Sequence, residues 1–168
     1  MTAGRFVVLE GGEASGKSTQ AARLAAALDA VLTREPGGTP TGARVRALLL
    51  DPATGDLDSR TEALMMIADR AQHVAEVVRP ALAAGRLVVC DRYVDSTYAY
   101  QGYGRGLPLA LLRHAWQLAT GGLLPDLSIF VDVPVELGLQ RVGRRGAKDR
   151  LEAEERAFTT IQDERVAK

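Results

Sequence analysis

One eight-residue segment near the N-terminus constrains this chain more than any other feature. Residues 11–18 read Gly-Gly-Glu-Ala-Ser-Gly-Lys-Ser and satisfy the pattern G-x-x-x-x-G-K-[ST] in full. A short apolar run, Phe6-Val-Val-Leu9, precedes the segment, and the Ala- and Leu-rich residues 19–30 follow it. Because a strand before and a helix after are the setting of a phosphate-binding loop, we expect one here rather than a glycine turn that merely joins two elements.

The chemistry of such a loop assigns a role to most of its residues. Glycines let the backbone bend so that several N–H groups point at one phosphate chain, and the following helix adds its partial positive charge. We expect Lys17 to meet the outer phosphates and the hydroxyl of Ser18 to bind Mg²⁺. The residues expected to bind ATP are Gly11, Gly12, Glu13, Ala14, Ser15, Gly16, Lys17, Ser18 and Thr19. This motif leaves the second substrate open, because GTPases, motor ATPases and nucleoside monophosphate kinases all carry it.

The rest of the chain alternates between short apolar runs and segments with helical periodicity. The apolar runs predict strands at 6–9, 30–33, 87–90 and 127–131. The periodic segments predict helices at 19–30, 43–50, 59–84, 107–120 and 134–142. This alternation predicts an α/β fold with a parallel sheet covered by helices on both faces. A length of 168 residues suits a single domain.

Composition excludes several classes of protein. Lys and Arg total 21, as do Asp and Glu, so the chain lacks the basic excess of a polynucleotide-binding protein. Cys90 is the only cysteine, which excludes an internal disulfide and a cysteine metal cluster; its apolar surroundings favour a small buried side chain over a reactive thiol. The first apolar run is too short for a signal peptide, and none is long enough to span a membrane. We therefore expect a cytoplasmic protein.

Seven short motifs, in order, resemble those of the bacterial thymidylate kinases. They occur from Phe6 to about Glu155: residues 6–11, 33–38 (Thr-Arg-Glu-Pro-Gly-Gly), 68–73 (Ala-Asp-Arg-Ala-Gln-His), 91–96 (Asp-Arg-Tyr-Val-Asp-Ser), 98–102 (Tyr-Ala-Tyr-Gln-Gly), 125–126 (Pro-Asp) and 149–152 (Asp-Arg-Leu-Glu). One such motif can arise by chance, whereas seven in order are specific. The resemblance implies a P-loop nucleoside monophosphate kinase fold, transfer of the γ-phosphoryl group of ATP to dTMP with Mg²⁺, and a homodimer.

The resemblance implies roles at the phosphates for three residues. Asp91 ends an apolar strand, where a carboxylate can hold Mg²⁺ directly or through water; a helix cap or strand-end aspartate is the structural alternative. Arg92 matches the family arginine that clamps the phosphate of the monophosphate, for which a planar guanidinium is well suited. Arg46 matches a second arginine on the same phosphate, with an arginine on a solvated helix face as the alternative.

By the same resemblance, further residues complete the dTMP site around the base and the sugar. Arg70, Thr97 and Gln101 are expected at the base, although Arg70 also suits a salt bridge on its helix. Tyr100 is expected beside the sugar. The substrate-binding set is completed by Glu13, Glu35 and Met66, the last standing where the family usually has a phenylalanine that stacks on thymine.

Two further features concern the C-terminal part. Residues 141–150 are basic and correspond to the family's lid. Arg145 and Arg150 are therefore expected to stabilise the negative charge that develops during phosphoryl transfer, with Arg144 and Lys148 as close alternatives. The structural alternative is that this basic segment is only a solvated loop. The sequence stops at Lys168, where the family continues into a further strand and helix, so these elements are expected to be missing. The alternatives to a dTMP kinase are a related kinase for another nucleotide and a nucleotide-binding fragment without activity.

Overall fold

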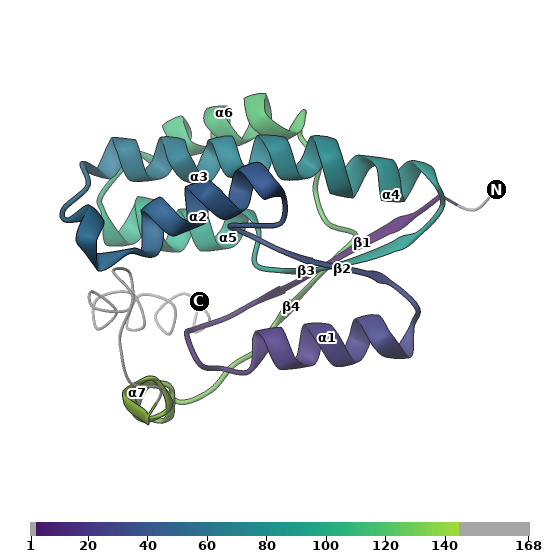
Figure 1. The fold of residues 1–168 in the computed structure, drawn as a ribbon, viewed down its shortest axis with the longest axis horizontal. Coiled ribbons are helices and arrows are strands. Elements are labelled where there is room, and N and C mark those ends of the chain that lie inside the picture. The colour runs from purple at the N-terminus through teal and green to yellow at the C-terminus, as the bar shows by residue number, and fades with distance from the viewer. Residues whose placement is uncertain (1–2, 145–168) are drawn as a thin grey trace.

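Four parallel strands form the centre of residues 3–144, the part of the chain described by the computed structural model (Figure 1). Their order in the sheet is β2-β3-β1-β4. In the register of β1 and β3, Leu9 lies opposite Asp91, so the loops that follow these two strands leave the sheet side by side. The strands are β1 (Arg5–Glu10), β2 (Val31–Arg34), β3 (Leu87–Asp91) and β4 (Leu127–Phe130).

Helices cover both faces of this sheet, as predicted. Figure 1 shows α1 below the strands, and α2, α3, α4 and α6 above them. The α-helices are α1 (Lys17–Ala27), α2 (Pro40–Leu50), α3 (Ser59–His73), α4 (Arg79–Ala83), α5 (Val94–Thr97), α6 (Leu109–Thr120) and α7 (Val135–Arg144). The 3-10 turn η1 (Pro52–Thr54) and the π-helical segments η2 (Val74–Val78) and η3 (Tyr98–Gly104) complete the described elements. No described helix combines the length and the apolar character needed to cross a membrane.

The core lies on both sides of β1 and β3. Phe6 packs edge-on against Tyr93, with 5.1 Å between the ring centroids. Residues of α3, η2 and α6 belong to the same core cluster. On the opposite face, Leu9 and Val89 pack against Ala21 of α1. Cys90 is fully buried, which confirms the prediction from its sequence context; burial raises the pKa of its thiol well above the ordinary value.

Several element boundaries differ from the predictions. The second helix starts at Pro40 instead of residue 43, because the hydroxyl of Thr39 caps it by accepting a hydrogen bond from the backbone of Gly42 at 2.9 Å. The predicted 59–84 helix is present as α3, η2 and α4, with a π-helical stretch at its middle. Leu64, one of the periodic apolar residues of this segment, is 64% exposed. The helical residues 94–104 were not predicted at all.

Candidate active site

A pocket of about 240 Å³ lies where β1 and β3 end, and it brings most of the predicted site residues together. Those that line it are Glu13, Ala14, Gly16, Lys17, Ser18, Thr19, Glu35, Arg46, Met66, Arg70, Asp91, Arg92, Thr97, Tyr100 and Gln101. Three residues of the phosphate loop do not line the pocket: Gly11, Gly12 and Ser15. Sequence reasoning missed six of the lining residues: Arg34, Pro36, Leu50, Asp69, Tyr93 and Ser96.

The phosphate loop has the backbone that its glycines predict. Gly11 has a φ of 142°, and a Cβ atom there would lie 2.3 Å from the carbonyl oxygen of Val131. The ammonium group of Lys17 donates to the carbonyl oxygen of Gly12 and lies 3.4 Å from the hydroxyl of Ser15. Burial, with the neighbouring Arg92, lowers the pKa of Lys17 to about 8, against the opposing effect of Glu13 and Asp91. An added phosphate charge would favour the protonated form.

Ser18 and Asp91 meet in the lining of the pocket. The Ser18 hydroxyl donates to Asp91 Oδ2 at 2.5 Å, which joins the start of α1 to the end of β3. The other carboxylate oxygen, Oδ1, is buried and has no hydrogen-bond partner among the described residues. A hydroxyl and a carboxylate are hard oxygen ligands, and Mg²⁺ commonly uses one or two carboxylates together with phosphate oxygens and water. The side chains of these two residues are therefore suitable ligands for the Mg²⁺ ion that the phosphate loop implies.

Arg92 follows β3 and reaches across to the phosphate loop. Its guanidinium forms an ion pair with Glu13, donates to Ser96 Oγ at 3.0 Å and lies 5.3 Å from the centre of the Tyr100 ring. Burial alone would lower the pKa of Arg92, but Tyr100 and the surrounding carboxylates, Glu13 foremost among them, raise it, so the group stays charged. The backbone φ of Arg92 is 71°, in the left-handed region that favours glycine. A strained backbone of this kind is typical of functional sites.

Glu10, which sequence reasoning did not single out, holds the segment that follows Arg92. Its carboxylate accepts hydrogen bonds from the backbone N–H of Tyr93 at 2.8 Å and from the hydroxyl of Ser96 at 2.6 Å. Burial raises the pKa of Glu10, while these hydrogen bonds oppose the shift. A carboxylate at the end of a buried strand, directly before the phosphate loop, was the available signal.

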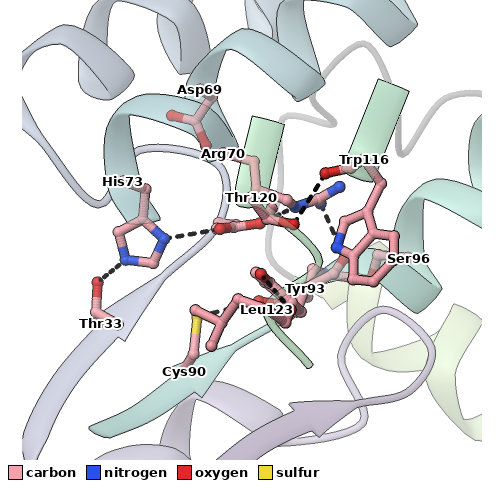
Figure 2. A network of polar contacts seen from close by, with 12 residues as sticks. Thr33, Asp69, Arg70, His73, Cys90, Tyr93, Ser96, Trp116, Thr120 and Leu123 are labelled. Atoms are coloured by element: carbon pink, nitrogen blue, oxygen red, sulfur yellow. Dashed lines mark hydrogen bonds and ion pairs between the residues drawn. The ribbon is translucent and has the colours of Figure 1, made fainter. Parts of the chain in front are cut away.

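A buried polar network forms another wall of the pocket (Figure 2). Glu35 Oε2 accepts from Arg70 Nε at 2.6 Å, and Glu35 Oε1 lies 2.7 Å from His73 Nδ1. The other ring nitrogen of His73 lies 2.6 Å from Thr33 Oγ1, a contact that Figure 2 shows clearly. Arg70 also donates to the carbonyl oxygen of Tyr93 at 3.0 Å, and its Nη1 is buried without a hydrogen-bond partner in the described region. Burial alone would lower the pKa of Arg70, but Glu35 raises it.

The remaining predicted residues differ in their burial and in their hydrogen bonds. Gln101 is buried and donates to Glu62 Oε1 at 2.8 Å; Thr97 is likewise buried. Met66 is partly exposed at the pocket wall. Arg46 donates to the carbonyl oxygen of Pro36 at 3.1 Å, so it contacts the loop after β2 rather than lying free in solvent.

The predicted lid at 141–150 is described only up to Arg144, which is the last residue of α7. Within this part, Arg141 Nη1 donates to the carbonyl oxygen of Ala14 at 3.1 Å, which ties α7 to the phosphate loop. Arg145 and Arg150, the predicted lid arginines, lie outside the described residues, as does the alternative Lys148.

Comparison with known proteins identifies the family. A sequence model of the thymidylate kinase family matches residues 9–167. A thymidylate kinase of Pseudomonas putida is 53% identical over 160 residues, which cover 92% of this chain and 76% of that protein. One from Desulfovibrio desulfuricans is 57% identical over 145 residues, covering 83% of this chain and 67% of that protein. The crystal structure of the Ehrlichia chaffeensis thymidylate kinase superposes with a TM-score of 0.75 at 34% identity, covering 98% of this chain and 83% of that one. This chain belongs to the thymidylate kinase family.

Proposed function

We propose that the pocket binds ATP and dTMP together and transfers the γ-phosphoryl group of ATP to dTMP, giving ADP and dTDP. The observation that carries this assignment is the continuity of one pocket from Lys17 and Ser18 to Arg70 and Gln101. A donor and an acceptor bound at its two ends would have their phosphates next to Arg92. This arrangement matches the reaction that names the family to which the chain belongs.

At the donor end, the loop 11–19 would hold the phosphate chain of ATP. Backbone N–H groups and the N-terminus of α1 favour the negative charge there, and Lys17 would meet the outer phosphates. Ser18 and Asp91 would hold Mg²⁺, which neutralises charge on the phosphate oxygens when it is bound.

At the acceptor end, Arg92 and Arg46 would clamp the phosphate of dTMP. Arg70, Thr97 and Gln101 would meet the base, with Met66 against its ring. Tyr100, Glu13 and Glu35 would surround the sugar.

The chain's own residues then act by positioning and by stabilising charge. A dTMP phosphate oxygen attacks the γ-phosphorus in line, and the bond to the β-phosphate oxygen breaks, so that ADP leaves. No general base is required, because the attacking phosphate is already ionised at neutral pH. We assign the stabilisation of the equatorial oxygens to Arg92 and to the lid arginines Arg145 and Arg150.

We further propose that the protein acts as a homodimer in the cytoplasm. Exposed leucines lie on two helices that pack together, α3 and α6, and a second copy of the chain would bury side chains of this kind. The residues concerned are Leu64, Leu111 and Leu118.

The function is tested by measuring ADP release from Mg·ATP with dTMP, dUMP, dCMP or no acceptor. We expect strong stimulation by dTMP, and loss of that stimulation when EDTA removes the metal or when Lys17 is changed to Met. Folded protein that binds an ATP analogue but responds to no acceptor would contradict the proposal and identify a nucleotide-binding module. Sedimentation of the same sample tests the dimer.

A further inference from the structure

Glu62 of α3 is a fully buried carboxylate placed directly behind the pocket wall. Its side chain has 0% exposure and does not line the pocket, whereas Gln101 does. Glu62 Oε1 accepts from Gln101 Nε2 at 2.8 Å and from Arg105 Nε at 3.3 Å, and Oε2 accepts from Arg105 Nη2 at 2.9 Å. Glu62 would therefore act on a ligand in the pocket through its hydrogen bond with Gln101.

This contact fixes which end of the Gln101 amide faces Glu62. An amide oxygen and an amide nitrogen are similar in size, so a rotation of 180° fits the same space but exchanges an acceptor for a donor. Paired with the guanidinium of Arg105, Glu62 is a carboxylate that can only accept hydrogen bonds. A rotated amide would place its oxygen against that carboxylate, where two buried acceptors would face each other without a proton. The amide is thus held with Nε2 toward Glu62, which leaves Oε1 available to the pocket.

The fixed amide has consequences for the base. Thymine presents a donor, N3–H, next to a carbonyl acceptor, whereas cytosine presents an acceptor at N3 next to an amino donor. An amide oxygen that faces the pocket can accept a hydrogen bond from N3–H of thymine, and the second N–H of the same amide can donate to the neighbouring thymine carbonyl. Against cytosine, the same oxygen would meet the N3 lone pair. A freely rotating amide would match both bases equally.

We propose that Glu62 is a positioning residue for base selection: it holds the Gln101 amide in the orientation that accepts N3–H of thymine and rejects cytosine. The inference rests on the proposed function, in which Gln101 contacts the base of the monophosphate. It adds a residue that touches no substrate, together with Arg105, whose guanidinium pairs with Glu62 and orients it.

The test compares kcat/KM for dTMP and dCMP in the wild type and in Glu62→Gln. The substitution keeps the shape of the side chain but lets it either donate or accept, so Gln101 is free to rotate. We expect the dTMP-to-dCMP ratio of kcat/KM to fall by at least about fivefold, while KM for ATP stays unchanged. Glu76→Gln is the matched control, because Gln72 donates to Glu76 in an exposed pair on the same long helix; it should leave the ratio unaltered.

A double-mutant cycle separates positioning from a general structural effect. In the Gln101→Ala background, adding Glu62→Gln should change the ratio by less than about twofold, because the amide through which Glu62 acts is gone. An equal loss of selectivity in both backgrounds would overturn the inference. So would an unchanged ratio in Glu62→Gln. If Glu62→Gln does not fold, Arg105→Gln replaces it, since that side chain is partly exposed; an unchanged ratio there overturns the inference too.

The failure of the inference is distinguishable from the failure of the proposed function. A wild-type protein without dTMP-stimulated ADP release would overturn both. A wild-type protein that prefers dTMP to dCMP, with variants that keep the same preference, would overturn the role of Glu62 alone.

Discussion

The guanidinium of Arg92 is paired with the carboxylate of Glu13, so the residue that follows β3 is joined to the loop that follows β1. The pair lies in the pocket, where the phosphates of donor and acceptor would meet in the proposed complex. An incoming phosphate has to share or replace this contact, and Arg92 stays charged while it does so.

Replacing Arg92 tests its role at the transferred group. We expect Arg92→Ala to lower kcat/KM for dTMP by about 10²-fold or more, because one charged donor to the reacting phosphates is lost. Arg92→Lys should restore little, since a lysine cannot form two parallel hydrogen bonds to a phosphate. Affinity for an ATP analogue should change far less than turnover. Arg113→Ala, which removes an exposed arginine on α6, serves as the control.

The lowered pKa of Lys17, about 8, predicts a pH dependence of nucleotide binding. Above that pH the free protein loses the proton of Lys17, whereas bound phosphate favours the charged form, so binding must take up a proton. We therefore expect the association constant for a non-hydrolysable ATP analogue to fall by up to about tenfold per pH unit above pH 8. Titration calorimetry in two buffers of different ionisation enthalpy measures the proton uptake directly.

A matched variant isolates this effect. Lys17→Arg keeps its charge throughout the range, so its affinity should lack this decline above pH 8, whatever its absolute value. A decline of the same steepness in Lys17→Arg would assign the pH dependence to another group.

Glu35 is expected to matter for stability as well as for binding. Its carboxylate compensates buried Arg70 and contacts His73, so Glu35→Ala leaves a buried guanidinium without its main partner. We expect the free energy of unfolding in urea to fall by about 3–5 kcal/mol. Arg60→Ala, which breaks an exposed ion pair with Asp58, should cause a much smaller change. Equal losses of unfolding free energy in the two variants would mean that the buried network contributes no more to stability than the exposed ion pair.

The resemblance to the thymidylate kinases implies that Met66 takes the position of a phenylalanine that stacks on thymine. Methionine contributes roughly 0.3–1.5 kcal/mol against an aromatic ring, and a phenylalanine ring would add directional stacking on the base. We expect Met66→Phe to lower KM for dTMP by about two- to fivefold and to leave KM for ATP unchanged. Met65→Phe makes the same change at the adjacent position, which does not line the pocket, and should have no such effect. A KM for dTMP that rises in Met66→Phe would show that the ring does not fit.

The strands and the phosphate loop could be predicted because their signals are local. The apolar run before Gly11 and the motif itself lie within thirteen residues of sequence, 6–18. The resemblance of the motifs likewise implied a dTMP site with Arg70, Arg92 and Gln101, and these three residues line the pocket.

What the sequence did not predict depends on contacts between distant residues. Glu62 and Gln101 are 39 residues apart, and Glu10 and Ser96 are 86 apart, so no periodicity or short motif connects them. Glu62 lies in a helix whose hydrophobic periodicity indicated only which face is apolar and gave no role to a buried carboxylate. The π-helical segments were missed for a related reason, since a widened turn is not encoded in hydrophobic spacing.

The backbone of Arg92 has an evolutionary consequence. An arginine with a φ of 71° occupies a conformation that glycine or asparagine adopts at lower cost. The backbone conformation and the chemistry of phosphoryl transfer therefore favour different residues at this one position. In a lineage released from the need for activity, glycine here would relieve the backbone, while the ion pair between Arg92 and Glu13 would be lost. Such a replacement in a relative would mark a descendant that has kept the architecture and abandoned the chemistry.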